Sequence, residues 1–149
     1  MITKDTIQNW PVLAKVDDIT IIPKIHDKKA RNAIRKYGTK ELQPNDVILL
    51  IDNTILRSAK QGMFLTETHL YAKSAYSGDY KIALADIETI DPHVRHPIKP
   101  IPVFGFTINS EYFVSLPGLN QLIVEGKERK TGLEILVIVL AHLLDCVII

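Results

Sequence analysis

The sequence predicts a mainly β protein, α+β overall, whose body is a seven-stranded antiparallel sandwich or barrel. Short apolar stretches follow one another closely along the middle of the chain, and turn residues such as Asn109-Ser110 separate them. This spacing is too tight for the helical crossovers that parallel strands require. The expected strands are Val47–Ile51, Met63–Thr66, Leu70–Ser74, Tyr80–Leu84, Ile87–Ile90, Val103–Ile108 and Tyr112–Leu116.

The C-terminal part predicts one helix, Thr131–Asp145, that caps this body. Its polar side chains gather on one narrow stripe, and because the rest of its circumference is apolar we expect burial on more than one side. The segment is too short and too interrupted by charge to span a bilayer, which needs about 20 apolar residues. One side can close an open barrel, and residues 1–43 or another copy of the chain can cover the other.

Ahead of the body, residues 1–43 predict a helical N-terminal extension that packs on a domain of residues 44–149. The type of structure in residues 1–22 is ambiguous, since the apolar run Ile19–Ile22 suits either a helix or a strand. Gln43-Pro44-Asn45-Asp46 marks the entry to the body with turn-forming residues.

Residues 27–37 predict a short basic amphipathic helix with an acidic first turn and a glycine after its last turn. At about 100° per residue, one face is apolar and the opposite face is cationic. The apolar face holds Ala30, Ala33, Ile34 and Tyr37, and the cationic face holds Lys28, Arg31, Arg35 and Lys36. Such a helix marks a membrane-surface or nucleic-acid contact in some proteins. It also fits a packed helix with a solvated charged back, which we favour because the apolar face lacks the Trp, Phe or Leu of membrane insertion.

Composition narrows the classes of function. The formal net charge of +1 gives no reason to expect nucleic acid as a partner. The single cysteine, Cys146, cannot form an internal disulfide and fits a reducing compartment. Residues 1–15 lack the uninterrupted apolar core of a secretory signal. We therefore expect a cytoplasmic protein.

A set of motif residues lies between Gly62 and Ile90. It comprises Gly62, Phe64-Leu65-Thr66, Glu67, Leu70-Tyr71, Gly78 and Asp86-Ile87. This arrangement resembles the signature of bacterial pleckstrin-homology-like (PH-like) domains, although His69 stands where that family commonly has Gly. The resemblance covers roughly residues 45–145. It implies seven strands capped by a C-terminal helix, in a fold that more often binds partners than catalyses reactions.

The resemblance also implies a place for lipid, because animal PH domains often bind phosphoinositides through Lys and Arg near the first hairpin. In this chain the linker Thr54–Gln61 supplies two cations there, fewer than the about four to eight that make an electrostatic lipid site. The basic helix would complete the number if it packs beside the linker; otherwise the linker cations are solvated loop residues. The candidates for ligand or lipid binding are thus Lys28, Lys29, Arg31, Arg35, Arg57 and Lys60.

Residues 91–102 predict a long connector that four prolines hold rigid. Loops of this length in compact domains are often functional. We expect His93, Arg95 and His96 to form part of a partner-binding rim. Asp91 and the two histidines could also approach one metal ion, but a structural zinc needs four ligands. No metal site and no cofactor are therefore expected.

No familiar catalytic motif occurs in the sequence, which contains no GxSxG, GxGxxG, Walker A or HExxH pattern. Cys146 adjoins a very apolar segment, where a thiol is more often inert than nucleophilic. We expect a non-enzymatic binding or scaffold module that acts through protein–protein contact and self-association, with a protein or peptide partner that the sequence does not identify. The alternative is a peripheral membrane-surface module that binds anionic lipid through basic residues, and a metal-dependent enzyme is a remote third.

Overall fold

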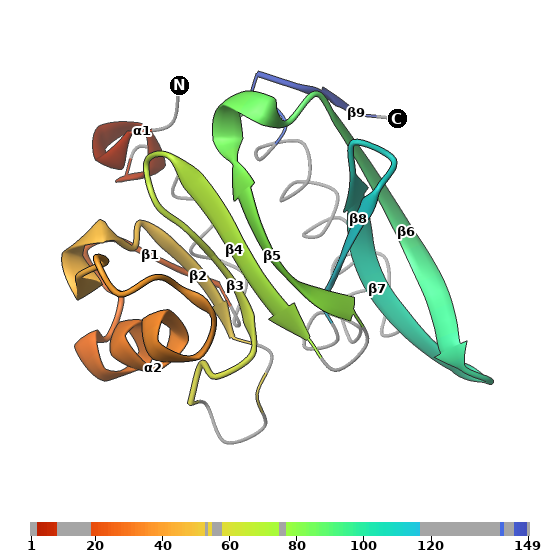
Figure 1. Cartoon of the computed structure of the whole chain (residues 1–149), viewed down its shortest axis with the longest axis horizontal. Coiled ribbons are helices and arrows are strands. Elements are labelled where there is room, and N and C mark those ends of the chain that lie inside the picture. Colours follow the sequence, from red (N-terminus) through yellow and green to blue (C-terminus); the bar gives the residue numbers. More distant parts are fainter. Residues whose placement is uncertain are drawn as a thin grey trace.

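The computed structural model of the chain describes residues 3–8, 19–52, 54, 58–74, 77–116, 141 and 145–148. Within these ranges the protein is mainly β, with nine strands in two open sheets (Figure 1). Every strand pairing is antiparallel except the parallel pairing of β6 with β9. The described part of the chain contains no helix that is both long and apolar enough to cross a bilayer.

The first sheet has the order β1-β2-β3-β4-β5, and the second has the order β8-β7-β6-β9. The strands of the first sheet are β1 (Ile19–Ile21), β2 (Leu49–Asp52), β3 (Gly62–Leu65), β4 (His69–Ser74) and β5 (Ser77–Ala83). Those of the second are β6 (Thr89–Ile98), β7 (Ile101–Ile108), β8 (Tyr112–Ser115) and β9 (Val147–Ile148). The α-helices are α1 (Lys4–Gln8) and α2 (Asp27–Tyr37), and two short 3-10 helices are η2 (Pro44–Asp46) and η3 (Leu84–Asp86).

The main core lies between the two sheets. Alternate residues of the first sheet, such as Leu49, Ile51 and Met63, belong to the same buried cluster as Phe106 and Val114 of the second sheet. Alternation with a period of two places these side chains on one face of each sheet. The apolar side chains that face each other across the gap therefore hold the two sheets together.

Helix α2 covers the other face of the first sheet. Ala30 and Ala33 pack with Leu50, Phe64 and Tyr71 in a second buried cluster. The small alanine side chains let the helix lie close to the sheet, where the Phe64 and Tyr71 rings stack with centroids 4.8 Å apart. Strand β2 is therefore buried on both faces, which explains why its first three residues, 49–51, are all apolar instead of alternating.

The mainly β expectation is confirmed, and each of the seven expected segments overlaps one of the strands β2 to β8. The expected count of seven strands is not what the described residues show, because their two sheets hold nine strands. Two further strands lie outside that set: β9, which was not expected, and β1, which falls in the run Ile19–Ile22 whose type the sequence left open. Strand β1 pairs with β2, so the description of residues 1–43 as helical needs correcting at Ile19–Ile21. The expected cap Thr131–Asp145 lies outside the described residues, apart from Ala141 and Asp145.

The prediction of a connector at residues 91–102 was wrong. Residues 89–98 and 101–108 form a long hairpin, β6–β7, whose register runs from Ile90 opposite Ile108 to Ile98 opposite Ile101. A proline interrupts a central strand because it cannot donate a hydrogen bond, but an edge strand tolerates it. Along most of its length β6 is such an edge among the described strands, because its pairing with β9 is confined to Thr89 and Ile90.

Candidate functional site

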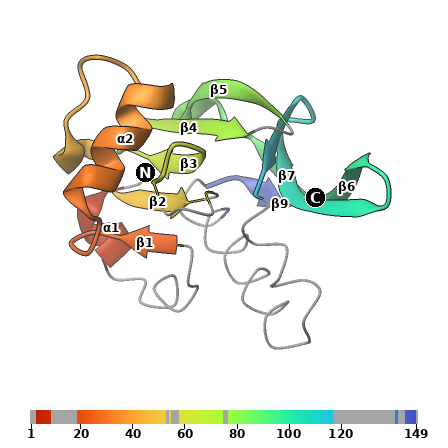
Figure 2. The same cartoon turned by 90° about the horizontal axis from the view of Figure 1, so that it is seen from below.

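The hairpin β6–β7 extends beyond the strands that flank it. Strand β8 pairs with β7 over residues 105–108, and β9 pairs with β6 only at its first two residues. We call residues 91–98 and 101–104 the β6–β7 arm. Figures 1 and 2 both show this part of the hairpin reaching one end of the molecule.

One face of the arm carries an aromatic and cationic cluster. The guanidinium carbon of Arg95 lies 4.2 Å from the centroid of the Phe113 ring, and the His93 ring meets the same ring edge-on with centroids 5.1 Å apart. His93 Nε2 shares a hydrogen bond of 2.9 Å with Thr107 Oγ1. Because Phe113 is only 4% exposed, it serves as a buried base on which the two polar side chains of β6 are positioned.

Gly105 makes this stacking possible. It lies opposite His93 in the ladder, and a side chain there would collide with the Val114 carbonyl oxygen and lie 2.7 Å from the Phe113 ring. The absence of a Cβ at this position lets the ring of Phe113 lie across β7 toward β6.

The structure places the three residues of the expected rim on the arm and brings two of them, His93 and Arg95, together against Phe113. His93 and Arg95 lie on the face of Phe113, while the alternation of the strand turns Val94 to the opposite face. His96 is exposed and lies where the register of the hairpin shifts. Val94 is 40% exposed and is the one exposed large hydrophobic residue among those whose side-chain burial the structure describes.

The cations expected for lipid binding divide into two groups. Lys28, Arg31 and Arg35 are exposed on α2, and Arg31 makes an exposed ion pair of 3.3 Å with Asp27 one turn earlier. Lys29 instead turns toward the sheet, where its Nζ lies 3.3 Å from Asp52 Oδ2 at the end of β2. The charge of Lys29 therefore compensates a carboxylate that is 5% exposed.

The environment of Asp52 is polar and buried. Its Oδ1 accepts hydrogen bonds from the backbone N–H and the hydroxyl of Thr54. Its Oδ2 pairs with Lys29 and accepts no hydrogen bond from any other group that the structure describes. The Tyr37 hydroxyl is also buried and makes no hydrogen bond with any described group. Burial and the nearby Asp52 carboxylate together raise the pKa of Tyr37 well above its usual range.

Helix α2 does pack beside the linker that follows β2. Asn32 Nδ2 donates a hydrogen bond of 2.9 Å to the carbonyl oxygen of Ser58, and Ala59 is buried in the same cluster as Ala33. Lys60 follows and is exposed, whereas Arg57 lies outside the described residues. The cations of the basic helix and of the linker could act together only if the helix packs beside the linker, and this requirement is met for Lys60.

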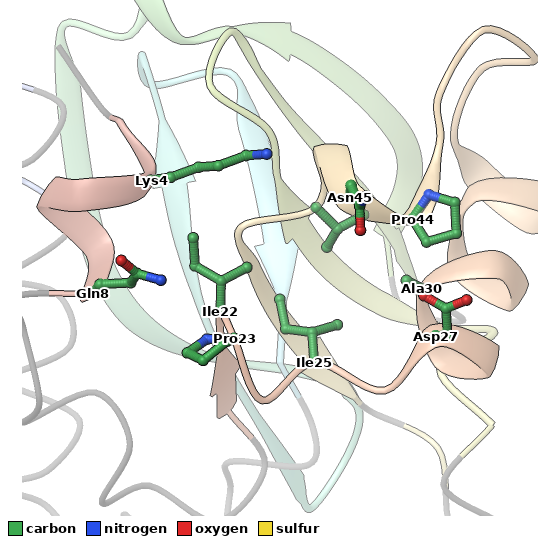
Figure 3. Close-up of a pocket in the computed structure, with 10 residues that line it drawn as sticks. Lys4, Gln8, Ile22, Pro23, Ile25, Asp27, Ala30, Pro44 and Asn45 are labelled. Carbon is green, nitrogen blue, oxygen red and sulfur yellow. The ribbon is translucent and has the colours of Figure 1, made fainter.

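A pocket of about 270 Å³ lies between α1, the segment before α2, and η2 (Figure 3). Its floor is apolar, with Ile22, Ile25 and Val47, and polar side chains such as Lys4 and Asp27 stand at its margins. Ligand pockets usually enclose about 300–1,000 Å³. Since Lys4 and Asp27 are both exposed, solvent weakens any charge that they could apply to a ligand here.

The described residues offer no obvious reaction centre. Burial raises the pKa of the Cys146 thiol, which lowers the fraction of reactive thiolate at neutral pH. No three His, Cys, Asp or Glu side chains in the described ranges converge as metal ligands would.

Sequence reasoning missed Phe113, Thr107, Asp52 and Asn32. Phe113 and Thr107 meet His93 only once the register of β6, β7 and β8 is known. For Asp52 the sequence does contain one indication, since it directly follows the apolar run of residues 47–51. A carboxylate at the end of a buried strand needs a charged or hydrogen-bonding partner.

No family model, curated protein or solved structure matches the chain. The function is therefore argued from the arrangement of its own residues.

Proposed function

We propose that this protein is a non-enzymatic binding module that works through protein–protein contact, including self-association, and that the β6–β7 arm is its contact surface. The observation that carries the proposal is the outer edge of β6, which from Asp91 to Ile98 faces no described strand. An open strand edge offers unpaired backbone groups to another chain.

The prolines of β6 limit how a partner can add to this edge. In an antiparallel ladder, the N–H groups of alternate residues point away from the partner strand. Pro92 has no N–H, so it fits the ladder without loss at an outward-pointing position, and Val94 then points its N–H group the same way. The edge therefore supports a short contact around Val94 instead of a long continuous sheet.

The side chains around this short edge suit a protein partner. Val94 supplies apolar area next to the backbone, and covering it would remove an exposed hydrophobic surface from water. Arg95 is held over Phe113, so less conformational freedom is lost when it binds a carbonyl or carboxylate. A second copy of the chain is the first partner to test because it is present in every preparation.

The class of protein and its location belong to the same proposal. The motif residues between Gly62 and Ile87 support a PH-like body, and the mainly β fold is compatible with it. A single cysteine in the whole sequence fits a cytoplasmic location.

The test is native mass spectrometry of the purified protein across a dilution series, with the variant Val94→Glu beside the wild type. We expect the wild type to form a closed oligomer that dissociates at a concentration at least about tenfold higher in the variant, because Val94→Glu places a charge in the contact. Lys81→Glu is the control, since Lys81 is exposed on β5 in the other sheet.

A wild type that stays monomeric up to the highest concentration would rule out self-association, and an oligomer that Val94→Glu leaves intact would rule out the arm as its interface. The same spectra would reveal a bound small molecule or metal ion as an increase in mass. If the protein catalyses a reaction that is lost when this ligand is removed, the non-enzymatic part of the proposal is contradicted.

A further inference from the structure

The exposed cations of α2 form one line along the helix. Lys28, Arg31 and Arg35 recur at intervals of three and four residues, which places them on the same face. That face is turned away from Ala30 and Ala33, which are buried against the sheet. Figure 2 shows α2 on the outer side of the first sheet.

Other exposed cations surround this line. Lys24 and Lys40 lie just before and just after the helix, and Lys36 lies on the same side of α2 as Asn32, which is hydrogen-bonded to the linker that carries Lys60. Against these seven exposed cations stand three exposed carboxylates, those of Asp27 and Glu41 within residues 24–41 and that of Asp46 in η2, which contacts α2. The surface is therefore strongly positive on a molecule whose formal net charge is only +1.

The helix cannot enter a bilayer as an inserted amphipathic helix, because its apolar face is already used. Ala30, Ala33 and Tyr37 are buried against Leu50 and Phe64 of the sheet. Any contact that α2 makes with a charged surface is therefore made by Lys and Arg head groups alone, and it must weaken as salt screens them.

We infer that this face of α2 is an interaction surface for an anionic membrane, on which the protein adsorbs by electrostatic attraction without inserting. The number of exposed cations lies within the range of about four to eight that suffices for such binding. Their line is on the outside of a helix, and none of Lys28, Arg31 and Arg35 lines the pocket of Figure 3, so the surface suits an extended charged plane better than a small anion.

Nucleic acid fits this surface less well. Proteins that bind single strands combine cations with exposed aromatic side chains on which bases stack. The one aromatic residue of α2, Tyr37, is buried between the helix and the sheet. The inference is independent of the arm, which belongs to the other sheet and uses none of these residues.

The experiment is cosedimentation with vesicles of phosphatidylcholine, with and without phosphatidylserine, at low and high salt. We expect binding only to vesicles that contain phosphatidylserine, with a loss of binding at high salt. The variant Arg31→Gln/Arg35→Gln should bind about tenfold to thirtyfold more weakly, from the typical contribution of each cation. The matched control is Lys81→Gln/Lys99→Gln, which removes the same charge from exposed positions on β5 and at the tip of the arm.

Three results would overturn the inference. They are no binding to phosphatidylserine vesicles at low salt, an equal loss in the matched control, and tighter binding to a DNA or RNA oligonucleotide than to the vesicles at the same salt. The arm variant Val94→Glu should leave vesicle binding unchanged, so this inference and the proposed function succeed or fail separately.

Discussion

Helix α2 and the β6–β7 arm both present cations to solvent, but the protein supports them in different ways. Helix α2 is anchored along its length, by Ala30 and Ala33 against the first sheet and by the ion pair of Lys29 with Asp52. The arm is paired with the rest of its sheet mainly at its base, and one edge of β6 faces no described strand. One region is a fixed helix face, and the other is an extended ribbon.

This difference separates the kinds of partner that each region suits. Between its two ends, the backbone of α2 is hydrogen-bonded within the helix, so the outer face of these turns offers charge and no unpaired strand edge. The arm offers backbone groups and Val94 as well as the charge of Arg95. A charged surface is therefore the natural partner of α2, whereas another polypeptide chain is the natural partner of the arm.

Substitution at the base of the arm should have the largest effect on stability. Gly105→Ala introduces a Cβ that would collide with the Val114 carbonyl oxygen and the Phe113 ring, and we expect a loss of about 3 kcal/mol in the free energy of unfolding. Denaturant unfolding measures it. Gly78→Ala is the control, because a Cβ there would meet only the Tyr80 side chain, at 3.2 Å. An equal loss in both variants would show that glycine flexibility, and not the packing of Phe113, is what matters.

Breaking the anchor of α2 should have the next largest effect. Lys29→Met leaves the buried Asp52 carboxylate without its cation, and we expect a loss of about 2 kcal/mol. Lys29 is 30% exposed, so solvent reaches the pair and keeps the loss below that of a fully buried pair. Lys28→Met, the same change at the neighbouring exposed position, should alter stability by less than about 0.5 kcal/mol. Equal effects of the two substitutions would contradict the structural role of the pair.

The smallest expected effect concerns the Tyr37 hydroxyl. Because it is buried without a hydrogen bond from any described group, Tyr37→Phe should stabilise the protein by about 1 kcal/mol while preserving the ring contact with Phe64. A destabilisation of similar size would show instead that the hydroxyl is bonded to the Asp52 carboxylate.

The same residue predicts a dependence on pH. Burial raises the pKa of Tyr37 in the folded protein above the value of about 10 in the unfolded chain. Above pH 10 the unfolded chain therefore binds fewer protons than the folded protein, and stability falls as pH rises, by up to about 1.4 kcal/mol per pH unit. Below pH 10 this contribution is complete. Unfolding curves at alkaline pH should show the decline in the wild type and a smaller one in Tyr37→Phe.

The contrast between the regions also explains what could be predicted from the sequence. Helix α2 was predicted with the bounds that the structure gives, Asp27–Tyr37, because helical periodicity and end signals are local properties of the chain. That Ala30, Ala33 and Tyr37 share the buried face of the helix followed from the same periodicity. The periodicity did not predict that Lys29 pairs with a buried carboxylate while Lys28 stays exposed, since this difference depends on where Asp52 lies in space.

The arm could not be predicted in the same way. Pro92 and its neighbouring prolines are typical of a loop unless the strand is known to lie at an edge, and an edge is defined by the topology of the whole sheet. The contact of Arg95 with Phe113 depends on the registers of two hairpins, which single-strand patterns do not determine. The predictions for Arg57 and for the helix Thr131–Asp145 remain predictions, because these residues lie outside the described ranges apart from Ala141 and Asp145.

The most direct test of the central claim is amide hydrogen exchange of the whole protein at two concentrations, one below and one above its association midpoint. If the arm is the interface, the amides of residues 91–98 exchange more slowly at the higher concentration, most of all that of Val94, while those of α2 do not change. Protection that rises in α2 instead, or that is the same at both concentrations throughout residues 91–98, would contradict the claim that the protein associates through its arm.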